Sequence, residues 1–294
     1  MDHRHDREQP FYPAATFADM PKIPSLTFNN GVEIPQVGFG VFLVPSEETK
    51  AAVSSALETG YRHIDTAKIY GNEEAVGEAI TESPVDREDI FVTTKCWNDD
   101  QGYDSARKAF DASMQRLGFD YLDLYLIHWP VPSQDRYVET WKALESLYAE
   151  GRVRAIGVSN FQPAHLQRLF DETDIVPAIN QIELHPWLQQ RELRAFHAEH
   201  GIITEAWSPL AAGGDFLEDP TIATIAKKHE VSPAQVILRW HLDLGNVIIP
   251  KSVNPSRMAS NMDLFGFELD EDDRSDIAGL DKGHRVGPDP DTLE

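Results

Sequence analysis

Short apolar segments typical of buried β-strands recur along this chain at a nearly constant interval. They are QVGFGVF, YRHIDTA, IFVTTK, YLDLYLIH, VRAIGVS, AINQIE, IITEAW and NVIIP. From Gly38 to Ile248 their mean spacing is about 30 residues, the length of one strand–loop–helix unit. Segments with helical periodicity fill the intervals, and Ser232 with Gln235 forms a capping box at the start of one of them. This alternation predicts parallel strands joined by helices.

Two folds share that alternation, a closed (β/α)₈ barrel and a doubly wound open sheet. An open sheet that binds a dinucleotide carries G-x-G-x-x-G after its first strand. Here Gly38 and Gly40 supply only two glycines, and VFLVP follows them. We therefore predict an α/β protein whose residues 23–294 form one domain, a (β/α)₈ TIM barrel. Residues 1–22, polar and containing proline, are expected to be a disordered N-terminal tail.

The composition limits the cellular compartments and binding partners that fit this chain. The chain carries 49 acidic and 26 basic side chains, a formal net charge of −23. Such a surface argues against nucleic acid and anionic membranes as partners. No apolar stretch approaches a membrane span, the first twenty residues lack the apolar core of a signal peptide, and Cys96 is the one cysteine. We expect a cytoplasmic monomer that acts on a small molecule.

Four reactive side chains lie at or after the ends of three consecutive strand-like segments. Asp65 ends the second segment, Lys95 the third and His128 the fourth, while Tyr70 follows Asp65 in a loop. Barrel enzymes build their active sites at the carboxyl ends of the strands. These four residues are therefore our predicted catalytic set.

The four residue types suit the reduction of a carbonyl group. A phenol has a pKa of about 10, too high for efficient acid catalysis near neutrality, and a nearby ammonium lowers it. Lys95 is expected to act in this way on Tyr70, with Asp65 holding Lys95 and His128 orienting the substrate oxygen. Taken singly, each residue is more typical of a structural role. Together at three strand ends they favour catalysis.

The motifs around these residues resemble the aldo-keto reductase superfamily, from about Leu26 to Asp291. The similar segments are GYRHIDTAKIYGNEEAVGEAI, LYLIHWP, GVSNF and IPKSVNP, in the family's order. The resemblance implies Tyr70 as general acid, Lys95 and Asp65 as its tuning pair and His128 as the orienting residue. The short GPDPDT ending resembles the bacterial 2,5-diketo-D-gluconate reductase-like branch. It implies an open site and small substrates such as keto-sugar acids, methylglyoxal or aromatic aldehydes.

A nicotinamide cofactor would have to be held by the loops of such a barrel. Lys251 and Arg257 form a basic pair in an acidic chain and suit a 2′-phosphate, which predicts NADPH over NADH. Trp207 is expected to stack on the nicotinamide. No metal site is expected, because the histidines lack ligand spacing. The predicted cofactor residues are Ser159, Asn160, Gln181, Trp207, Ser208, Leu210, Lys251, Ser252, Arg257 and Asn261, and the predicted pocket walls are Phe42, Trp97 and Trp129.

Two other function classes stay open at this point. A nicotinamide-binding regulatory subunit, like those on potassium channels, would need a surface for its partner, and no distinctive apolar segment is evident. A glycosidase would use two carboxylates in the same type of barrel. It would have no use for the Lys251–Arg257 pair.

Overall fold

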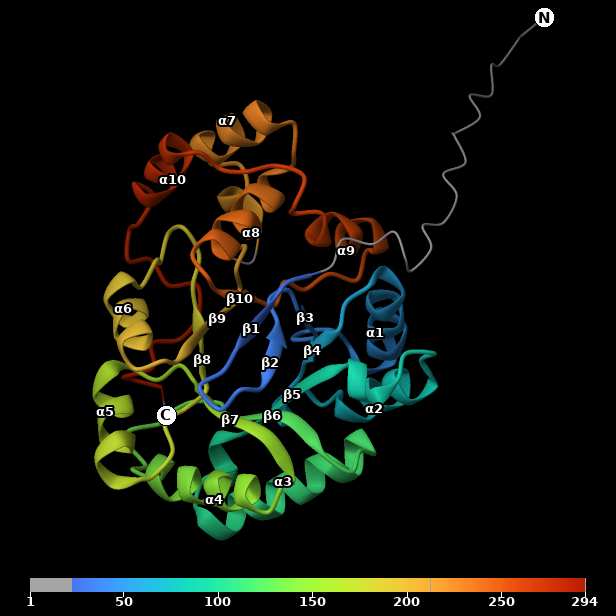
Figure 1. Cartoon of the computed structure of the whole chain (residues 1–294), viewed down its shortest axis with the longest axis vertical. Helices are drawn as coiled ribbons and strands as arrows, with labels where there is room; N and C mark the ends of the chain where they lie inside the picture. The colour runs from blue at the N-terminus through green and yellow to red at the C-terminus, as the bar shows by residue number, and fades with distance from the viewer. Residues whose placement is uncertain (1–22, 212, 294) are drawn as a thin grey trace, which may run out of the picture.

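The computed structural model of the chain describes residues 23–211 and 213–293, and the predicted tail 1–22 lies outside this range. Its centre is a sheet of eight parallel strands that follow one another in chain order (Figure 1). The strands are β3 (Phe39–Gly40), β4 (His63–Asp65), β5 (Phe91–Cys96), β6 (Leu122–Ile127), β7 (Val153–Ser159), β8 (Ile179–Glu183), β9 (Ile203–Trp207) and β10 (Val247–Ile248).

The first and last strands of this sheet meet and close it. Val37, just before β3, forms a parallel bridge with Ile248 of β10. The Gly38 amide donates to the Ile248 carbonyl at 2.7 Å, and the Ile248 amide donates to the Gln36 carbonyl at 3.0 Å. Closure confirms the predicted barrel and excludes the doubly wound sheet, whose edge strands stay apart.

Helices surround the barrel (Figure 1). Strands β3 to β8 are each followed by one α-helix, and both α7 and α8 lie between β9 and β10. The Ser232–Gln235 capping box is confirmed at the start of α8. The helices are α1 (Ser46–Thr59), α2 (Glu73–Glu82), α3 (Tyr103–Leu117), α4 (Tyr137–Ala149), α5 (Pro163–Glu172), α6 (Arg191–Glu199), α7 (Pro220–His229), α8 (Pro233–Asp243), α9 (Pro255–Met262) and α10 (Glu271–Ala278).

A β-hairpin that the sequence analysis did not predict covers one end of the barrel. It pairs β1 (Ser25–Thr27) with β2 (Glu33–Pro35) and buries Phe28 and Ile34. These side chains pack with Phe91 and Ala178, which lie where β5 and β8 begin. The hairpin therefore closes the amino-terminal end of the barrel, and the opposite end is left for chemistry.

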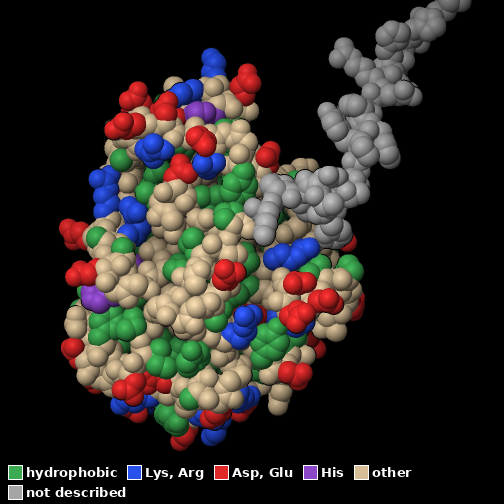
Figure 2. All heavy atoms as spheres, viewed as in Figure 1, with side chains coloured by type: hydrophobic (Ala, Val, Ile, Leu, Met, Phe, Trp, Pro, Cys, Tyr) green, Lys and Arg blue, Asp and Glu red, His purple; other side chains and the backbone are tan. Residues whose placement is uncertain are grey.

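The face of the molecule that carries the hairpin shows acidic side chains mainly near its edge (Figure 2). In the view onto the hairpin, Asp and Glu side chains gather along the outer helices, with Lys and Arg between them (Figure 2). Some acidic side chains form ion pairs on helix surfaces; for example, Arg168 Nε lies 2.7 Å from a carboxylate oxygen of Glu172. Within residues 23–211 and 213–293, no helix is long and apolar enough to cross a membrane.

Candidate active site

The end of the barrel opposite the hairpin collects the predicted catalytic residues. Asp65 is the last residue of β4, Lys95 is the second-last residue of β5, and His128 follows β6. Because these strands are parallel neighbours, their carboxyl ends lie side by side. Tyr70 ends a short 3₁₀ helix, Lys68–Tyr70, that follows β4. The fold therefore brings all four residues to one place.

Lys95 and Asp65 form a buried ion pair. The Lys95 Nζ donates to Asp65 Oδ1 at 2.6 Å and to the Thr66 carbonyl at 2.9 Å, and both charged side chains are at most 2% exposed. Burial by itself lowers the pKa of Lys95, but Asp65, Tyr70 and Glu205 together more than offset it, and the pKa lies above its ordinary value. Lys95 is thus a fixed cation under the reaction site.

Tyr70 lies directly above that cation. The Lys95 Nζ is 5.2 Å from the centre of the Tyr70 ring, and the His128 ring packs edge-on at 5.8 Å. Burial raises the pKa of Tyr70, and Lys95 lowers it by less, so the net shift is upward. Lys95 therefore lowers the pKa of Tyr70 as expected, but in the protein alone burial outweighs this effect.

His128 is held as a neutral ring. Burial, reinforced by the charge of Lys95, lowers its pKa well below the ordinary value. Its Nδ1 has no hydrogen-bond partner among the described residues. Buried N–H groups without a partner are rarer in proteins than under-satisfied acceptors, so the proton is assigned to Nε2. The ring can then donate a hydrogen bond to a substrate oxygen.

A belt of hydrogen bonds joins the ends of β7, β8 and β9. The Ser159 hydroxyl donates to the Gln181 carbonyl at 2.8 Å, and Asn160 Nδ2 donates to the His128 carbonyl at 3.0 Å. Trp207 Nε1 donates to Asn160 Oδ1 at 2.8 Å. Asn160 has a φ of 64°, a left-handed conformation that asparagine tolerates better than most residues. The four predicted nicotinamide contacts are therefore contiguous and lie beside His128.

The remaining predicted cofactor residues divide between two loops. Ser208 and Leu210 follow β9 and are partly buried, whereas Lys251, Ser252, Arg257 and Asn261 follow β10. Lys251 and Arg257 are exposed, and neither forms an ion pair with any residue in the described part of the chain. Arg257 lies in the first turn of α9, whose N-cap Asn254 accepts from the Arg257 amide at 3.2 Å. These two cations, one in the first turn of α9 and one in the loop that precedes it, are suited to an anion.

The three predicted pocket aromatics each contact a residue of the site. The ring of Phe42 lies 5.1 Å from Tyr70, and that of Trp97 lies 5.1 Å from His128. Trp129 stacks with His128 at 6.4 Å and meets Trp207 at the same distance. Phe42 is 55% exposed, so it has surface available for a ligand.

Two buried carboxylates near the site were missed by the sequence analysis. Glu183 ends β8, and its carboxylate accepts from the Val286 amide at 2.5 Å and from the Gly287 amide at 3.1 Å. A Cβ on Gly287 would lie 2.4 Å from the Trp207 ring, so only glycine allows this close contact. The carboxyl group of Glu205, on β9, accepts a hydrogen bond from Gln181 Nε2. Period-2 alternation hides such residues, because an acidic side chain in a strand is normally read as solvent-facing.

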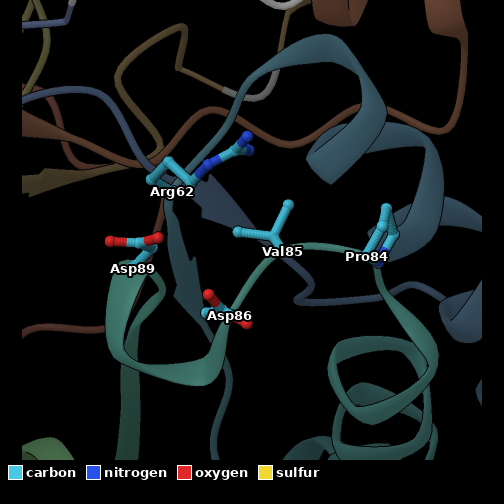
Figure 3. A pocket seen from close by; sticks show the side chains of 5 residues that line it. All are labelled: Arg62, Pro84, Val85, Asp86 and Asp89. Carbon is cyan, nitrogen blue, oxygen red and sulfur yellow. The ribbon is translucent and has the colours of Figure 1, made fainter.

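A surface hollow lined by Arg62, Pro84, Val85, Asp86 and Asp89 lies away from this site (Figure 3). Arg62 directly precedes β4, and Asp89 lies just before β5. The hollow is therefore at the amino-terminal end of the barrel, the end that the hairpin covers. It contains none of the predicted site residues.

Comparison with known proteins decides the family. A sequence profile described as "Aldo/keto reductase family" matches residues 38–282. The chain belongs to the aldo/keto reductase family. It is 60% identical over 270 residues to an aldo-keto reductase of Mycolicibacterium smegmatis, covering 92% of this chain and 98% of that protein. It is 53% identical over 267 residues to the methylglyoxal reductase DkgA of Escherichia coli K12, covering 90% and 96%.

Solved structures agree with the fold of this aldo-keto reductase. The aldo/keto reductase of Brucella melitensis superposes with a TM-score of 0.86 at 56% identity, covering 88% of this chain and 98% of that one. A mutant of Gox0644 in complex with NADPH gives a TM-score of 0.89 at 50% identity, covering 93% and 100%. The predicted family, barrel fold and oxidoreductase class are confirmed. Within residues 23–211 and 213–293, no group of three or more His, Cys, Asp or Glu could hold a metal ion.

Proposed function

We propose that this aldo-keto reductase uses NADPH to reduce small aldehydes and ketones to alcohols, with Tyr70 as the proton donor. The observation that carries the proposal is the buried Lys95–Asp65 pair, 2.6 Å apart, beneath Tyr70 and beside a neutral His128. A buried ion pair is often no more stabilising than a hydrophobic pair of similar volume, so stability alone does not account for these two charges. A fixed ammonium under a phenol gives the pair a chemical role.

The loops around the site fit NADPH. Ser159, Asn160 and Gln181 present amide and hydroxyl groups that suit the carboxamide, and Trp207 presents an indole beside them. Lys251 and Arg257, unpaired within the described residues, suit the 2′-phosphate. Ser208, Leu210, Ser252 and Asn261 would complete the contacts. The NADPH complex of Gox0644 supports this assignment.

The reaction needs a hydride on the carbonyl carbon and a proton on its oxygen. NADPH supplies the hydride when it is bound. The Tyr70 hydroxyl gives its proton to the oxygen, and Lys95 stabilises the phenolate that remains. Neutral His128 donates a hydrogen bond to the same oxygen and fixes its direction. The Phe42, Trp97 and Trp129 side chains surround the carbonyl and limit the access of water.

The proposed substrates are small and carry a reactive carbonyl. Methylglyoxal is the first candidate, because DkgA is named a methylglyoxal reductase and shares 53% of its residues with this chain over 267 positions. Keto-sugar acids and aromatic aldehydes are the next candidates. The exposed ring of Phe42 supports an open pocket that admits such molecules.

The test is a panel of carbonyl compounds followed by the loss of NADPH absorbance. Methylglyoxal, 2,5-diketo-D-gluconate and benzaldehyde are each supplied with NADPH and, separately, with NADH. We expect turnover of at least one compound with NADPH, and a lower kcat/KM with NADH. Oxidation of NADPH by none of the three would contradict the proposed activity.

A further inference from the structure

A second carboxylate lies under the predicted catalytic residues and has no part in the mechanism above. Glu205 stands on β9 opposite Gln181 of β8, and its side chain is fully buried. Gln181 Nε2 donates to Glu205 Oε2 at 2.8 Å and to Asp65 Oδ2 at 2.8 Å. One amide nitrogen therefore bridges two buried carboxyl groups, and Asp65 connects this bridge to Lys95.

The charges in this cluster do not balance if both carboxyl groups are ionised. Lys95 is the one cation close to them within the described residues, and it is bound to Asp65 at 2.6 Å. His63 Nε2 lies 3.7 Å from Glu205 Oε1, but burial lowers the pKa of His63 to about 3, so its ring is neutral. The uncharged hydroxyl of Thr93 on β5 lies 3.4 Å from His63 Nε2, and Val247 on β10 is apolar. Nothing in the cluster neutralises an ionised Glu205.

The bridge also fixes the direction in which Gln181 faces. Both hydrogens of its Nε2 are used inside the barrel, one on each carboxyl group. Only its Oε1 is then available to a ligand above the site. Without an acceptor at position 205, the amide would lose the partner that holds it in this orientation.

We propose that Glu205 is a positioning residue for the reaction, which holds Gln181 against Asp65 and sets the charge beneath Lys95 and Tyr70. This inference rests on the proposed function, because it concerns the same site. Burial and the neighbouring Asp65 raise the pKa of Glu205 to about 8. Near neutral pH Glu205 is therefore protonated, and the cluster holds one anion and one cation.

Ionisation of Glu205 at higher pH changes the pKa of the proposed proton donor, Tyr70. A negative charge at this position raises the pKa of both Lys95 and Tyr70. Tyr70 then retains its proton to higher pH than it would above a permanently neutral side chain. The same ionisation places an uncompensated charge in the core, which destabilises the fold.

Glu205→Gln tests the charge, because glutamine keeps an oxygen acceptor for Gln181 but cannot ionise. We expect the alkaline limb of the kcat profile for reduction to move to lower pH by about one unit, the size of shift that one nearby charge causes. The matched control is Glu268→Gln, at an exposed glutamate outside the site. Coincident pH profiles for Glu205→Gln and wild type would overturn the proposal.

Glu205→Leu tests the positioning, because it removes the acceptor as well as the charge. NADPH affinity, followed by tryptophan fluorescence, should weaken about tenfold in Glu205→Leu and less than twofold in Glu205→Gln, as expected for one lost hydrogen bond of about 1.4 kcal/mol. Equal affinity in wild type and Glu205→Leu would contradict the positioning role.

Measurements on the protein without cofactor test this inference independently of the proposed activity. The pKa of Glu205 is raised on folding, so its contribution to stability is complete below about pH 4.5 and is lost as pH rises through about 8. The urea midpoint of wild type should fall relative to that of Glu205→Gln across this window. Infrared difference spectra should show a protonated carboxylic acid in wild type at pH 7 that is lost by pH 10. Absence of this band at pH 7 would overturn the inference whether or not the protein reduces carbonyls.

Discussion

Replacing Tyr70 by phenylalanine removes one hydroxyl and almost nothing else. The ring contacts with Phe42 at 5.1 Å and His128 at 5.8 Å do not involve the oxygen. Lys95 keeps Asp65 Oδ1 and the Thr66 carbonyl as acceptors. The free energy of unfolding should therefore change by about 1 kcal/mol or less, the value of a single hydrogen bond. Any large kinetic effect then reports on the proton.

The expected kinetic loss follows from the missing proton transfer. A positioned general acid contributes about 10²- to 10⁴-fold to a rate, which corresponds to roughly 3–5 kcal/mol of activation free energy. His128 cannot replace the phenol as an acid, because its pKa lies well below the ordinary value and its ring is neutral. We therefore expect kcat to fall by at least 100-fold on every substrate, roughly 3 kcal/mol.

The assay compares wild type and Tyr70→Phe by steady-state reduction of the best substrate with NADPH. The dissociation constant for NADPH, measured by quenching of tryptophan fluorescence, serves as the control and should stay within threefold. A Tyr70→Phe protein that retains more than a tenth of the wild-type kcat would refute Tyr70 as the proton donor. An unchanged kcat with weakened NADPH binding would instead identify the hydroxyl as a cofactor contact.

Three further outcomes follow from the structure. Arg257→Ala should raise the dissociation constant for NADPH about 10- to 100-fold, because one charge-assisted contact is lost, and should leave the dissociation constant for NADH unchanged. The control Lys108→Ala, on the exposed face of α3, should alter neither constant. Equal losses of affinity for both nucleotides would contradict the 2′-phosphate assignment. Gly77→Ala should destabilise the protein by about 1–3 kcal/mol in urea unfolding, because its Cβ would lie 2.1 Å from a backbone oxygen of α3, while Gly266→Ala, with open space around it, should change little. The free energy of unfolding should fall as pH drops from about 6.5 toward 3, by up to about 4 kcal/mol per pH unit. The cause is that three buried histidines stay neutral in the fold and take up protons on unfolding. A urea midpoint that stays constant across this range would contradict their low pKa. These histidines are His63, His197 and His241, each with a pKa of about 3.

The barrel and the position of the candidate site were predictable because both depend on local patterns. Strand-like segments at a fixed interval give the topology, and parallel strands place Asp65, Lys95 and His128 at the same end without further information. The capping box at Ser232 follows from two residues three positions apart. Such signals are contained in short windows of sequence.

The features that were not predictable depend on contacts between distant segments. The Gln181 bridge joins residues 116 and 24 positions apart, and Glu183 holds amides more than 100 positions away. The hairpin of β1 and β2 is stabilised by packing against the amino-terminal end of the barrel. Its strands are short, so their sequence alone gives only a weak indication of β-structure. The upward pKa shift of Tyr70 depends on burial, which spacing along the chain does not reveal.

The most direct test of the account is the fate of the hydride. NADPH with deuterium in both C4 positions of the dihydronicotinamide is incubated with methylglyoxal and the wild-type protein, and the product alcohol is examined by NMR. We expect deuterium on the new carbinol carbon, with product formation reduced at least 100-fold by Tyr70→Phe. An alcohol without deuterium, or no alcohol from any carbonyl in the panel, would contradict the assignment of this chain as an NADPH-dependent carbonyl reductase.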